Sequence, residues 1–235
     1  RPRRALVSKK GTFAAAKAAA SNLASGRVNV CFHDFKAVNS LGVITQFAPW
    51  MAAVSAAAMQ AAGFYKGIVG KVINTSGALQ AAGDFDDSDD TQVEDALLAG
   101  LMPIGRTESG TYQWISDQTS YGSDSNFVYN SLQAIYAADL VAARCQLLME
   151  NGFKGQSLAD VSAALAKAAF ETVLAGCFRD KLLAASDDGA PMGFKNTKVR
   201  LVNGVALVCT GEIKIAGTVY FIPVQLAVSA VQQSA

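Results

Sequence analysis

The sequence predicts a mixed α+β fold (mixed α/β), in which a mixed sheet with flanking helices is followed by a C-terminal antiparallel β-meander. Two observations lead to this fold class. An alternating segment at 28–35, a helix-like segment at 48–62 and an apolar run at 67–73 follow one another along the chain, which is the order of a strand–helix–strand crossover unit. From residue 198 onward, apolar segments alternate with glycine-containing turns, which is typical of a meander.

The first helix is expected over 12–25, where alanines dominate, and it ends at Gly26. Alanine has the highest helix propensity, and glycine is the commonest residue just past a helix. The next helix follows the strand at 28–35, with Pro49 in its first turn and Gly63 just past its end. Helices favour these two residues at these two positions.

No charged residue lies between Lys36 and Lys66, a stretch long enough to span a bilayer. The stretch nevertheless contains amides, hydroxyls and a proline, and its apolar part is mostly alanine. We therefore expect a buried helix here and no membrane insertion.

An exposed acidic loop is expected over 83–90, within the broader acidic segment 83–95. Thr91 and Glu94 form a capping-box pair that predicts a short helix, and Gly100 can end it. The segment 102–119 then predicts a hairpin with its turn at 108–110.

Two long helices are expected next, over 127–151 and over 157–185, the second starting at the capping pair Ser157 and Asp160. The meander would consist of strands at 198–202, 205–215 and 218–229. Pro223 cannot donate a hydrogen bond to a neighbouring strand, so the last strand belongs at a sheet edge or a bulge. The first long helix carries a predicted apolar stripe at Tyr129, Leu132, Tyr136, Leu140, Ala143 and Leu147.

Composition limits the function. With 235 residues, a net charge of +1, 51% hydrophobic residues and only 17% charged residues, the chain is neither a generally basic nucleic-acid binder nor disordered. Soluble domains average about 25% charged residues. The deficit suggests surface that another chain covers.

The chain starts with Arg1 in place of Met, and further basic residues follow without the apolar region of a signal peptide. We expect a solvated basic terminus (Arg1, Arg3, Arg4, Lys9 and Lys10) on a fragment of a longer polypeptide. Two parts are expected: 1–110, with the strand–helix–strand unit and the acidic loop, and 111–235, with the long helices and terminal strands. The four cysteines form no C-x-x-C pair, which favours reduced thiols.

The acidic loop has a partial calcium-site pattern. Asp84, Asp86, Ser88 and Asp95 have the spacing of calcium ligands, but Asp89 stands where the loop requires glycine, and aspartate replaces the bidentate glutamate. A solvated loop is the favoured interpretation.

The only histidine, His33, lies between Cys31 and Asp34. A lone histidine in a strand lacks a second ligand of its type for a zinc site, so a hydrogen-bonded core side chain is expected. The sequence contains no G-x-S-x-G, H-E-x-x-H or dinucleotide-binding motif. We therefore predict no catalytic, cofactor-binding or metal-binding residues and no enzyme.

The second part of the chain resembles contractile tail sheath proteins of bacteriophages and related contractile injection systems. The resemblance is carried by WISDQTSY at 114–121, NSLQAIYAAD at 130–139 and FKG at 153–155, followed by a second helix and a terminal strand pair. It covers the last part of the chain well and the earlier part by general layout.

The resemblance implies a structural subunit that polymerises into six-fold rings stacked in a helical sleeve, and that contracts to drive a tail tube through a cell envelope during genome ejection. It implies the tail tube protein and the baseplate and tail terminator proteins as partners, with no nucleic acid and no cofactor. The expected location is the virion tail, assembled in the host cytoplasm.

Two sets of site residues follow from this resemblance. The end of the second long helix, at Arg179, Asp180 and Lys181, is expected to face the tube. The terminal strand is a long apolar edge that a monomer would have to hide, and pairing with a neighbour would hide it. The residues expected to exchange between subunits are Tyr220, Phe221, Ile222, Val224, Leu226 and Val228.

Two other functions remain open. An α/β-type enzyme with an unrecognised site would fit the strand–helix–strand order, although a fold alone does not determine function. A non-contractile virion or shell protein could use the same strand exchange without a tube.

Overall fold

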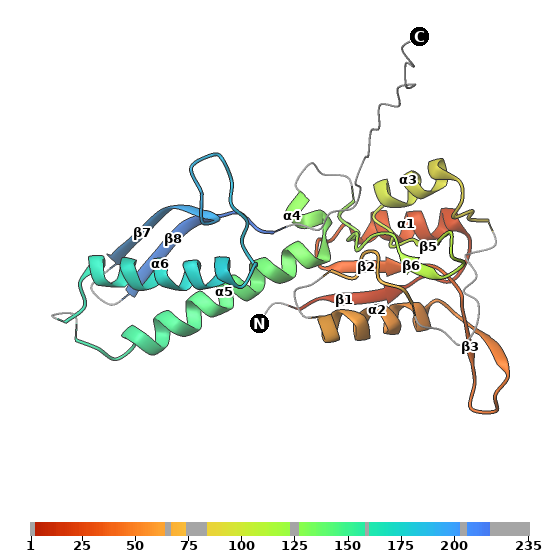
Figure 1. Ribbon diagram of the computed structural model, residues 1–235, viewed down its shortest axis with the longest axis horizontal. Helices are drawn as coiled ribbons and strands as arrows, with labels where there is room; N and C mark the ends of the chain where they lie inside the picture. The colour runs from red at the N-terminus through yellow and green to blue at the C-terminus, as the bar shows by residue number, and fades with distance from the viewer. Residues whose placement is uncertain are drawn as a thin grey trace, which may run out of the picture.

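A computed structural model describes residues 3–63, 67–73, 84–122, 127–157, 160–202 and 206–216. It shows two lobes along one long axis: a sheet lobe up to residue 130 and a helical lobe over 131–216 (Figure 1). Helices cover short strands in the sheet lobe, whereas a strand pair covers two long helices in the helical lobe. The predicted α+β class is confirmed.

The centre of the sheet lobe is a parallel strand pair, β1 (Ala5–Ser8) and β2 (Val28–Cys31), covered by α1 (Phe13–Leu23) on one face and by α2 (Trp50–Gly63) on the other (Figure 1). Successive side chains of β2 point alternately toward α1 and toward α2. Val30 packs with α1, and Cys31 packs with the small side chains of α2. Both faces of β2 are therefore buried, as is usual for a parallel strand.

The predicted crossover unit has the wrong second strand. The segment 67–73 forms no strand, and its Val72 makes a single antiparallel bridge to Gln113. The parallel partner of β2 is β1, which lies within the start of the chain that was expected to be a solvated basic terminus. The crossover helix is therefore α1, and the Thr12 hydroxyl caps its N-terminus.

Two hairpins complete the sheet lobe. The predicted one is confirmed as β5 (Ile104–Arg106) and β6 (Tyr112–Trp114). It lies across residues 110 and 111, the proposed boundary of the two parts, and that division stays a prediction. The other hairpin, β3 (Phe35–Val38) and β4 (Ile44–Phe47), was not predicted.

The short helix α3 (Asp90–Leu98) begins two residues earlier than the Thr91 cap predicts, because the Asp89 carboxylate accepts the hydrogen bond from the Thr91 amide. Gly100 follows the helix with φ +76°, and a Cβ there would lie 2.7 Å from the carbonyl oxygen of Thr119. Only glycine fits this position without strain.

The first long helix is interrupted. A short α4 (Phe127–Asn130) precedes α5 (Leu132–Phe153), and Ser131 between them caps α5 through its hydroxyl. The predicted stripe is correct only in part: Leu132 is buried and Leu140 packs on the helical core, but Tyr129 and Leu147 are 49% and 58% exposed. The buried residues of α5 are Leu132, Ala134, Ile135, Ala137 and Val141.

The second long helix, α6 (Ala163–Arg179), starts at the Ser162 cap and ends well before residue 185. A strand pair then follows, β7 (Phe194–Val202) and β8 (Ala206–Ile213), which are antiparallel as predicted. We call this pair the ribbon. The predicted turn at 203–204 and the third strand at 218–229 lie outside the described residues.

Candidate interaction surfaces

A buried polar segment, residues 116–120, connects the two lobes, and we call it the strap. The Asn29 side-chain amide on β2 donates to the carbonyl oxygens of Asp117 at 2.9 Å and Gln118 at 2.6 Å. The Ser120 amide donates to the Val28 carbonyl at 2.7 Å. The strap therefore continues the hydrogen bonding of β2. Its fully buried polar side chains are Ser116, Asp117, Thr119 and Ser120.

Asp117 joins the strap to the start of α5. Its carboxylate accepts from the Gln133 amide at 2.9 Å and from the Ser131 hydroxyl at 3.1 Å. A negative charge at a helix N-terminus is stabilising because the free amide groups there carry partial positive charge. The motif that carries the sequence resemblance, 114–121, thus has a structural role here.

A second connection between the lobes joins two arginines to Asp139 on α5, and we call it the clamp. Arg27 donates two hydrogen bonds to the Asp139 carboxylate, at 2.6 and 2.9 Å. Arg4 lies 3.4 Å from the same carboxylate, and its guanidinium stacks 4.1 Å from the centre of the Tyr136 ring. The hydrogen bond from Arg27 holds the pKa of Asp139 below its ordinary value, and burial lowers the pKa of Arg4.

The expectation of a solvated basic start was wrong for Arg4. No local spacing could reveal the clamp, because Arg4 and Asp139 lie 135 residues apart. Only the parallel pairing of β1 with β2 brings Arg4 and Arg27 to the same end of the sheet.

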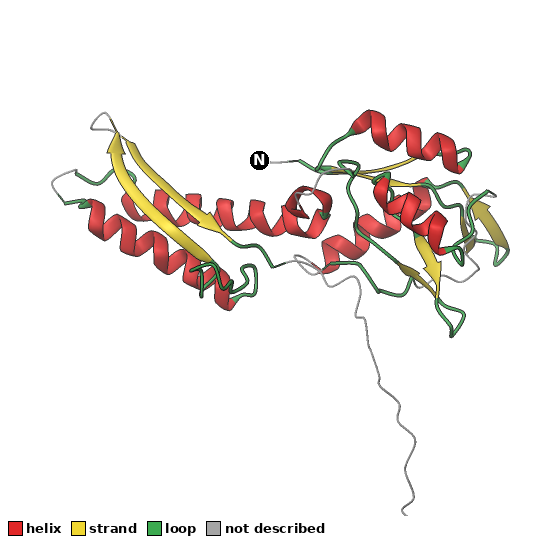
Figure 2. Cartoon of the chain, turned by 90° about the horizontal axis from the view of Figure 1, so that it is seen from above, coloured by secondary structure: helices red, strands yellow, loops and turns green. Residues whose placement is uncertain are grey.

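The ribbon lies along the α5–α6 pair (Figure 2). Side chains such as Val199 and Cys209 pack against a helical core that includes Phe170 and Leu174. Within the described residues the ribbon is a two-stranded sheet, and no other strand pairs with either of its outer edges. The edges therefore present backbone groups that another strand can bind.

The expected tube-facing residues lie together at the exposed end of α6. The helix ends in a Schellman arrangement: the Lys181 amide donates to the Phe178 carbonyl, and the Leu182 amide donates to the Cys177 carbonyl. Lys181 takes the left-handed conformation, with φ +60°.

Asp180 forms an ion pair with Arg144 on α5. Because Arg144 neutralises Asp180, the positive charges of Arg179 and Lys181 remain at this end of α6.

The acidic loop does not gather its carboxylates into one site. Asp84 accepts the Phe13 amide at 2.8 Å and so helps to cap α1. Asp89 caps α3, and Asp95 forms an ion pair with Lys17 at 3.1 Å. Among the described residues, no group of three or more histidine, cysteine, aspartate or glutamate side chains could hold a metal ion.

His33 is a hydrogen-bonded core side chain, as predicted. Its Nε2 accepts the Ile104 amide at 2.8 Å, and its ring lies against Phe32 and Phe85. Burial lowers the pKa of His33 to about 3. The side chain is therefore neutral at pH 7 and connects β2 to the β5–β6 hairpin.

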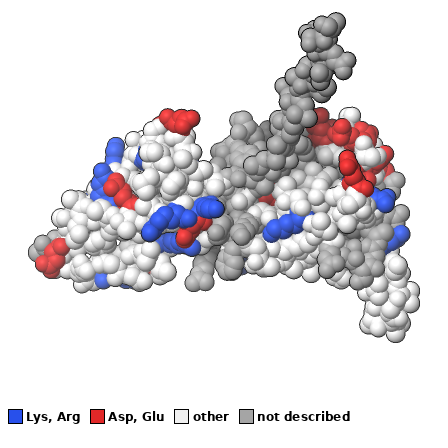
Figure 3. Space-filling model, viewed as in Figure 1, with Lys and Arg blue, Asp and Glu red and all other residues white. Residues whose placement is uncertain are grey.

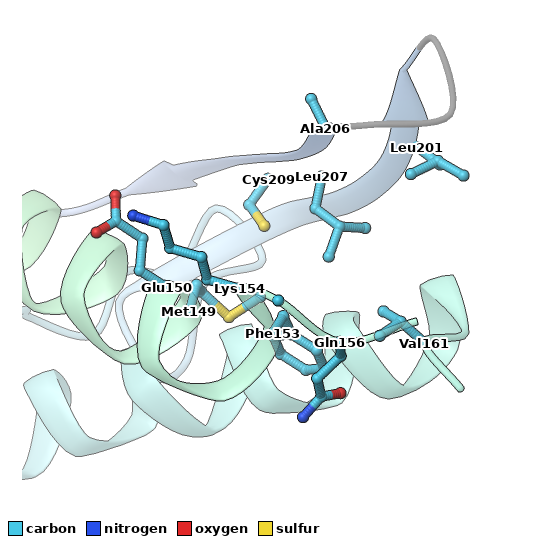
Figure 4. A pocket seen from close by; sticks show the side chains of 11 residues that line it. Met149, Glu150, Phe153, Lys154, Gln156, Val161, Leu201, Ala206, Leu207 and Cys209 are labelled. Carbon is cyan, nitrogen blue, oxygen red and sulfur yellow. The ribbon is translucent and has the colours of Figure 1, made fainter. Parts of the chain in front are cut away.

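Two hollows lie between the ribbon and α5. One, of about 610 Å³, opens at the far end of the helical lobe (Figure 4), and a second, of about 580 Å³, adjoins it along α5. Cys209 lines both hollows, and Cys145 lines the second. Burial raises the pKa of Cys145 to about 11.

The molecular surface is unevenly charged. Acidic side chains gather near α3, whereas the β3–β4 hairpin is white apart from its base (Figure 3). Among the described residues, no helix combines the length and apolarity needed to cross a bilayer. The residues expected to exchange between subunits, Tyr220 to Val228, lie outside the described part of the chain.

No protein-family model matches this chain, and no curated protein matches it in sequence. Solved structures do. The sheath complex of an extracellular contractile injection system, PVC, in its contracted state is similar with a TM-score of 0.66 and 12% identity, over 94% of this chain and 63% of that chain. The contracted helical sheath of the anti-feeding prophage is similar with a TM-score of 0.61 and 11% identity, over 86% and 56%.

The sheath tail protein from Desulfitobacterium hafniense is similar with a TM-score of 0.60 and 10% identity, over 90% of this chain and 49% of that chain. These structural neighbours are contractile sheath proteins, and the chain has their fold. It spans between about half and two thirds of their length.

Proposed function

We propose that this chain is a non-catalytic structural subunit of a contractile sheath, which polymerises into a helical sleeve around a rigid tube and contracts to drive the tube through a cell envelope. The observation that supports this function is the fold, which is similar to that of contractile sheath structures over 86–94% of this chain. Such a role requires strong contacts between subunits and no covalent chemistry.

The ribbon is the proposed link between subunits. A strand added to its free edge forms roughly five backbone hydrogen bonds at about 1 kcal/mol each, and each buried apolar side chain adds about 1.5–3 kcal/mol. We propose that the segment from Tyr220 to Val228 of a neighbouring subunit supplies such a strand. An exposed ion pair contributes only about 0–1 kcal/mol, so strand links would persist through contraction while polar contacts to the tube break.

The proposed tube contact is the exposed end of α6. Arg179 and Lys181 form a small basic patch there, because the negative charge of Asp180 is already paired with Arg144. An acidic tube surface would complement them. In a cryo-EM map of the extended sleeve we expect both side chains within 10 Å of the tube, about one screening length. A larger separation would remove this contact from the proposal.

The proposed partners are further copies of this chain in stacked six-fold rings, the tube protein, and the baseplate and tail terminator proteins. The proposed setting is the tail of a bacteriophage or of a related injection machine, assembled in the cytoplasm of the producing cell.

The test is assembly with the tube protein. The full-length protein, co-produced with the tube protein, should form striated sleeves in negative-stain images, and a truncation ending at Gly217 should form none. Sleeves from the truncated protein would remove the strand exchange. A full-length protein that forms closed shells, or that stays monomeric beside assembled tubes, would contradict the sheath function.

A further inference from the structure

The β3–β4 hairpin projects from one end of the molecule (Figure 1), and its tip presents apolar side chains to solvent. Leu41 is 83% exposed, and Val43 and Ile44 are 57% and 60% exposed. These are among the most exposed large apolar side chains of the described residues. No charged residue occurs between Lys36 and Lys66, so Lys36, near the base of the hairpin, is the one charged residue on β3 and β4.

The tip is held in a defined conformation. The side chain of Asn39 accepts from the amides of Leu41 at 2.9 Å and Val43 at 3.0 Å, and it donates to the Thr45 hydroxyl at 2.9 Å. The Gly42 amide donates to the Asn39 carbonyl at 3.0 Å, with Gly42 at φ +76°. An exposed side chain on a preorganised loop loses little entropy when it binds, which favours a contact role.

A hollow lies between the C-terminal end of α5 and the ribbon (Figure 4), and these elements form the opposite end of the long axis (Figure 1). Its volume of about 610 Å³ exceeds that of a leucine and a valine side chain together. The charged groups Glu150 and Lys154 border it. The apolar side chains that line it are Met149, Phe153, Val161, Leu201 and Leu207.

We propose that the β3–β4 tip of one copy inserts Leu41 and Val43 into the hollow beneath the ribbon of a second copy. This inference rests on the proposed sheath function and identifies an additional contact between subunits. The two surfaces differ and lie at opposite ends of one elongated molecule, so the contact is head-to-tail. Such a contact repeats without closing unless the rotation between copies closes a ring.

The size of the tip argues for a second copy as the occupant. The tip exposes three large apolar side chains, Leu41, Val43 and Ile44, whereas a stable independent interface involves about 20–30 residues and about 800 Å² on each partner. The tip is too small to capture a free protein from solution. It is sufficient for a neighbour already held by strand exchange, where the second contact is effectively intramolecular.

The native thiol of Cys209 lines the hollow and allows a direct test. Leu41→Cys and Val43→Cys proteins, assembled as full-length sleeves and oxidised with copper-phenanthroline, should each be examined on non-reducing gels. We expect a ladder of linked dimers, trimers and longer chains from at least one of them. Adding Cys145→Ser and Cys209→Ser should abolish it.

Leu98→Cys is the matched control, because Leu98 is similarly exposed, at 62%, but lies on α3. It should give no ladder. No ladder from either tip variant, or a ladder that survives removal of both native thiols, overturns the proposal.

A second measurement uses Leu41→Asp, with Leu98→Asp as its control. We expect Leu41→Asp to raise the concentration needed for sleeve assembly about tenfold, because a carboxylate would enter an apolar hollow. Assembly of Leu41→Asp at the wild-type concentration contradicts the inserted tip. If wild-type sleeves form and neither test responds, the tip contact fails while the sheath function stands; if wild-type protein forms no sleeves, the sheath function itself fails.

Discussion

Arg27 and Asp139 face each other across the junction of the two lobes and share two hydrogen bonds, at 2.6 and 2.9 Å. Paired bonds of this geometry between a guanidinium and a carboxylate are both strong and directional. Because Arg27 precedes β2 and Asp139 lies in α5, the pair fixes the direction in which α5 leaves the sheet lobe. The first prediction concerns its strength.

Asp139→Asn should lower the free energy of unfolding by about 1–2 kcal/mol at pH 7, since it removes the charge from both arginine contacts. The pKa of Asp139 is held below its ordinary value, so this stabilisation is present above about pH 4 and is lost as the pH falls further. Urea unfolding at pH 7 and pH 3 should therefore show two proteins whose stabilities converge at low pH.

Asp95→Asn is the control for Asp139, because Asp95 pairs with the exposed Lys17. It should change stability by less than about 0.5 kcal/mol. An equal loss in the two variants would show that the clamp is no stronger than an ordinary surface pair.

His33 should make the protein sensitive to mild acid. Its pKa is lowered to about 3 in the folded state and is about 6.5 in the unfolded state, so the unfolded state binds more protons between these values. Stability should fall as the pH drops below about 6.5, by about 2 kcal/mol at pH 5 from this residue alone.

His33→Gln provides the comparison, because glutamine can accept the Ile104 amide without titrating. The variant should be less stable at pH 7 but should lose less stability between pH 7 and pH 5. Parallel stability curves for the two proteins would contradict a neutral, buried His33.

Lys181→Gly should stabilise the protein. Lys181 occupies the left-handed position of the Schellman motif at φ +60°, where glycine has no Cβ to clash. We expect a gain of about 0.5–1 kcal/mol, reduced by the greater freedom of glycine in the unfolded chain. Lys181→Ala, which removes the charge but keeps the Cβ, should give no gain in the same urea titration.

Gly100→Ala should destabilise the protein by about 2–4 kcal/mol, because the new Cβ would meet the backbone of the strap at 2.7–2.8 Å while φ stays at +76°. Gly152→Ala is the matched control, since nothing lies within 4 Å of its added Cβ on α5, and it should be neutral or slightly stabilising. Thermal unfolding monitored by circular dichroism measures both.

Local signals in the sequence predicted local structure well. The start of α1 next to Thr12, the start of α2 after Pro49 and the turn between β5 and β6 all depend on residues a few positions apart, and the structure confirms them. Gly63 was expected just past α2 and is its last residue. The stripe on α5 was partly wrong, because the α5 residues that pack with α6 and the ribbon include Ala137, Val141, Cys145 and Met149, a face that the predicted positions follow only in part.

Features set by distant pairing were not predictable from one sequence. The segment 67–73 is as strand-like as β1, and only the tertiary fold decides which of them lies beside β2. The β3–β4 hairpin was not predicted because its turn, at Asn39 to Val43, contains no familiar turn dipeptide. The turn is held by the Asn39 side chain, which accepts hydrogen bonds from the amides of Leu41 and Val43. The clamp was not predictable either, because only the pairing of β1 with β2 brings Arg4 close to Arg27.

The strap and clamp both act on the first two turns of α5, whereas the hollow lies at its other end. A straight helix of 22 residues is about 33 Å long. A change of about 5° in its direction at the Asp117 end would therefore displace its other end by about 3 Å. A small adjustment where the lobes meet would thus be magnified at the opposite extremity, beside the end of β7 and the start of β8.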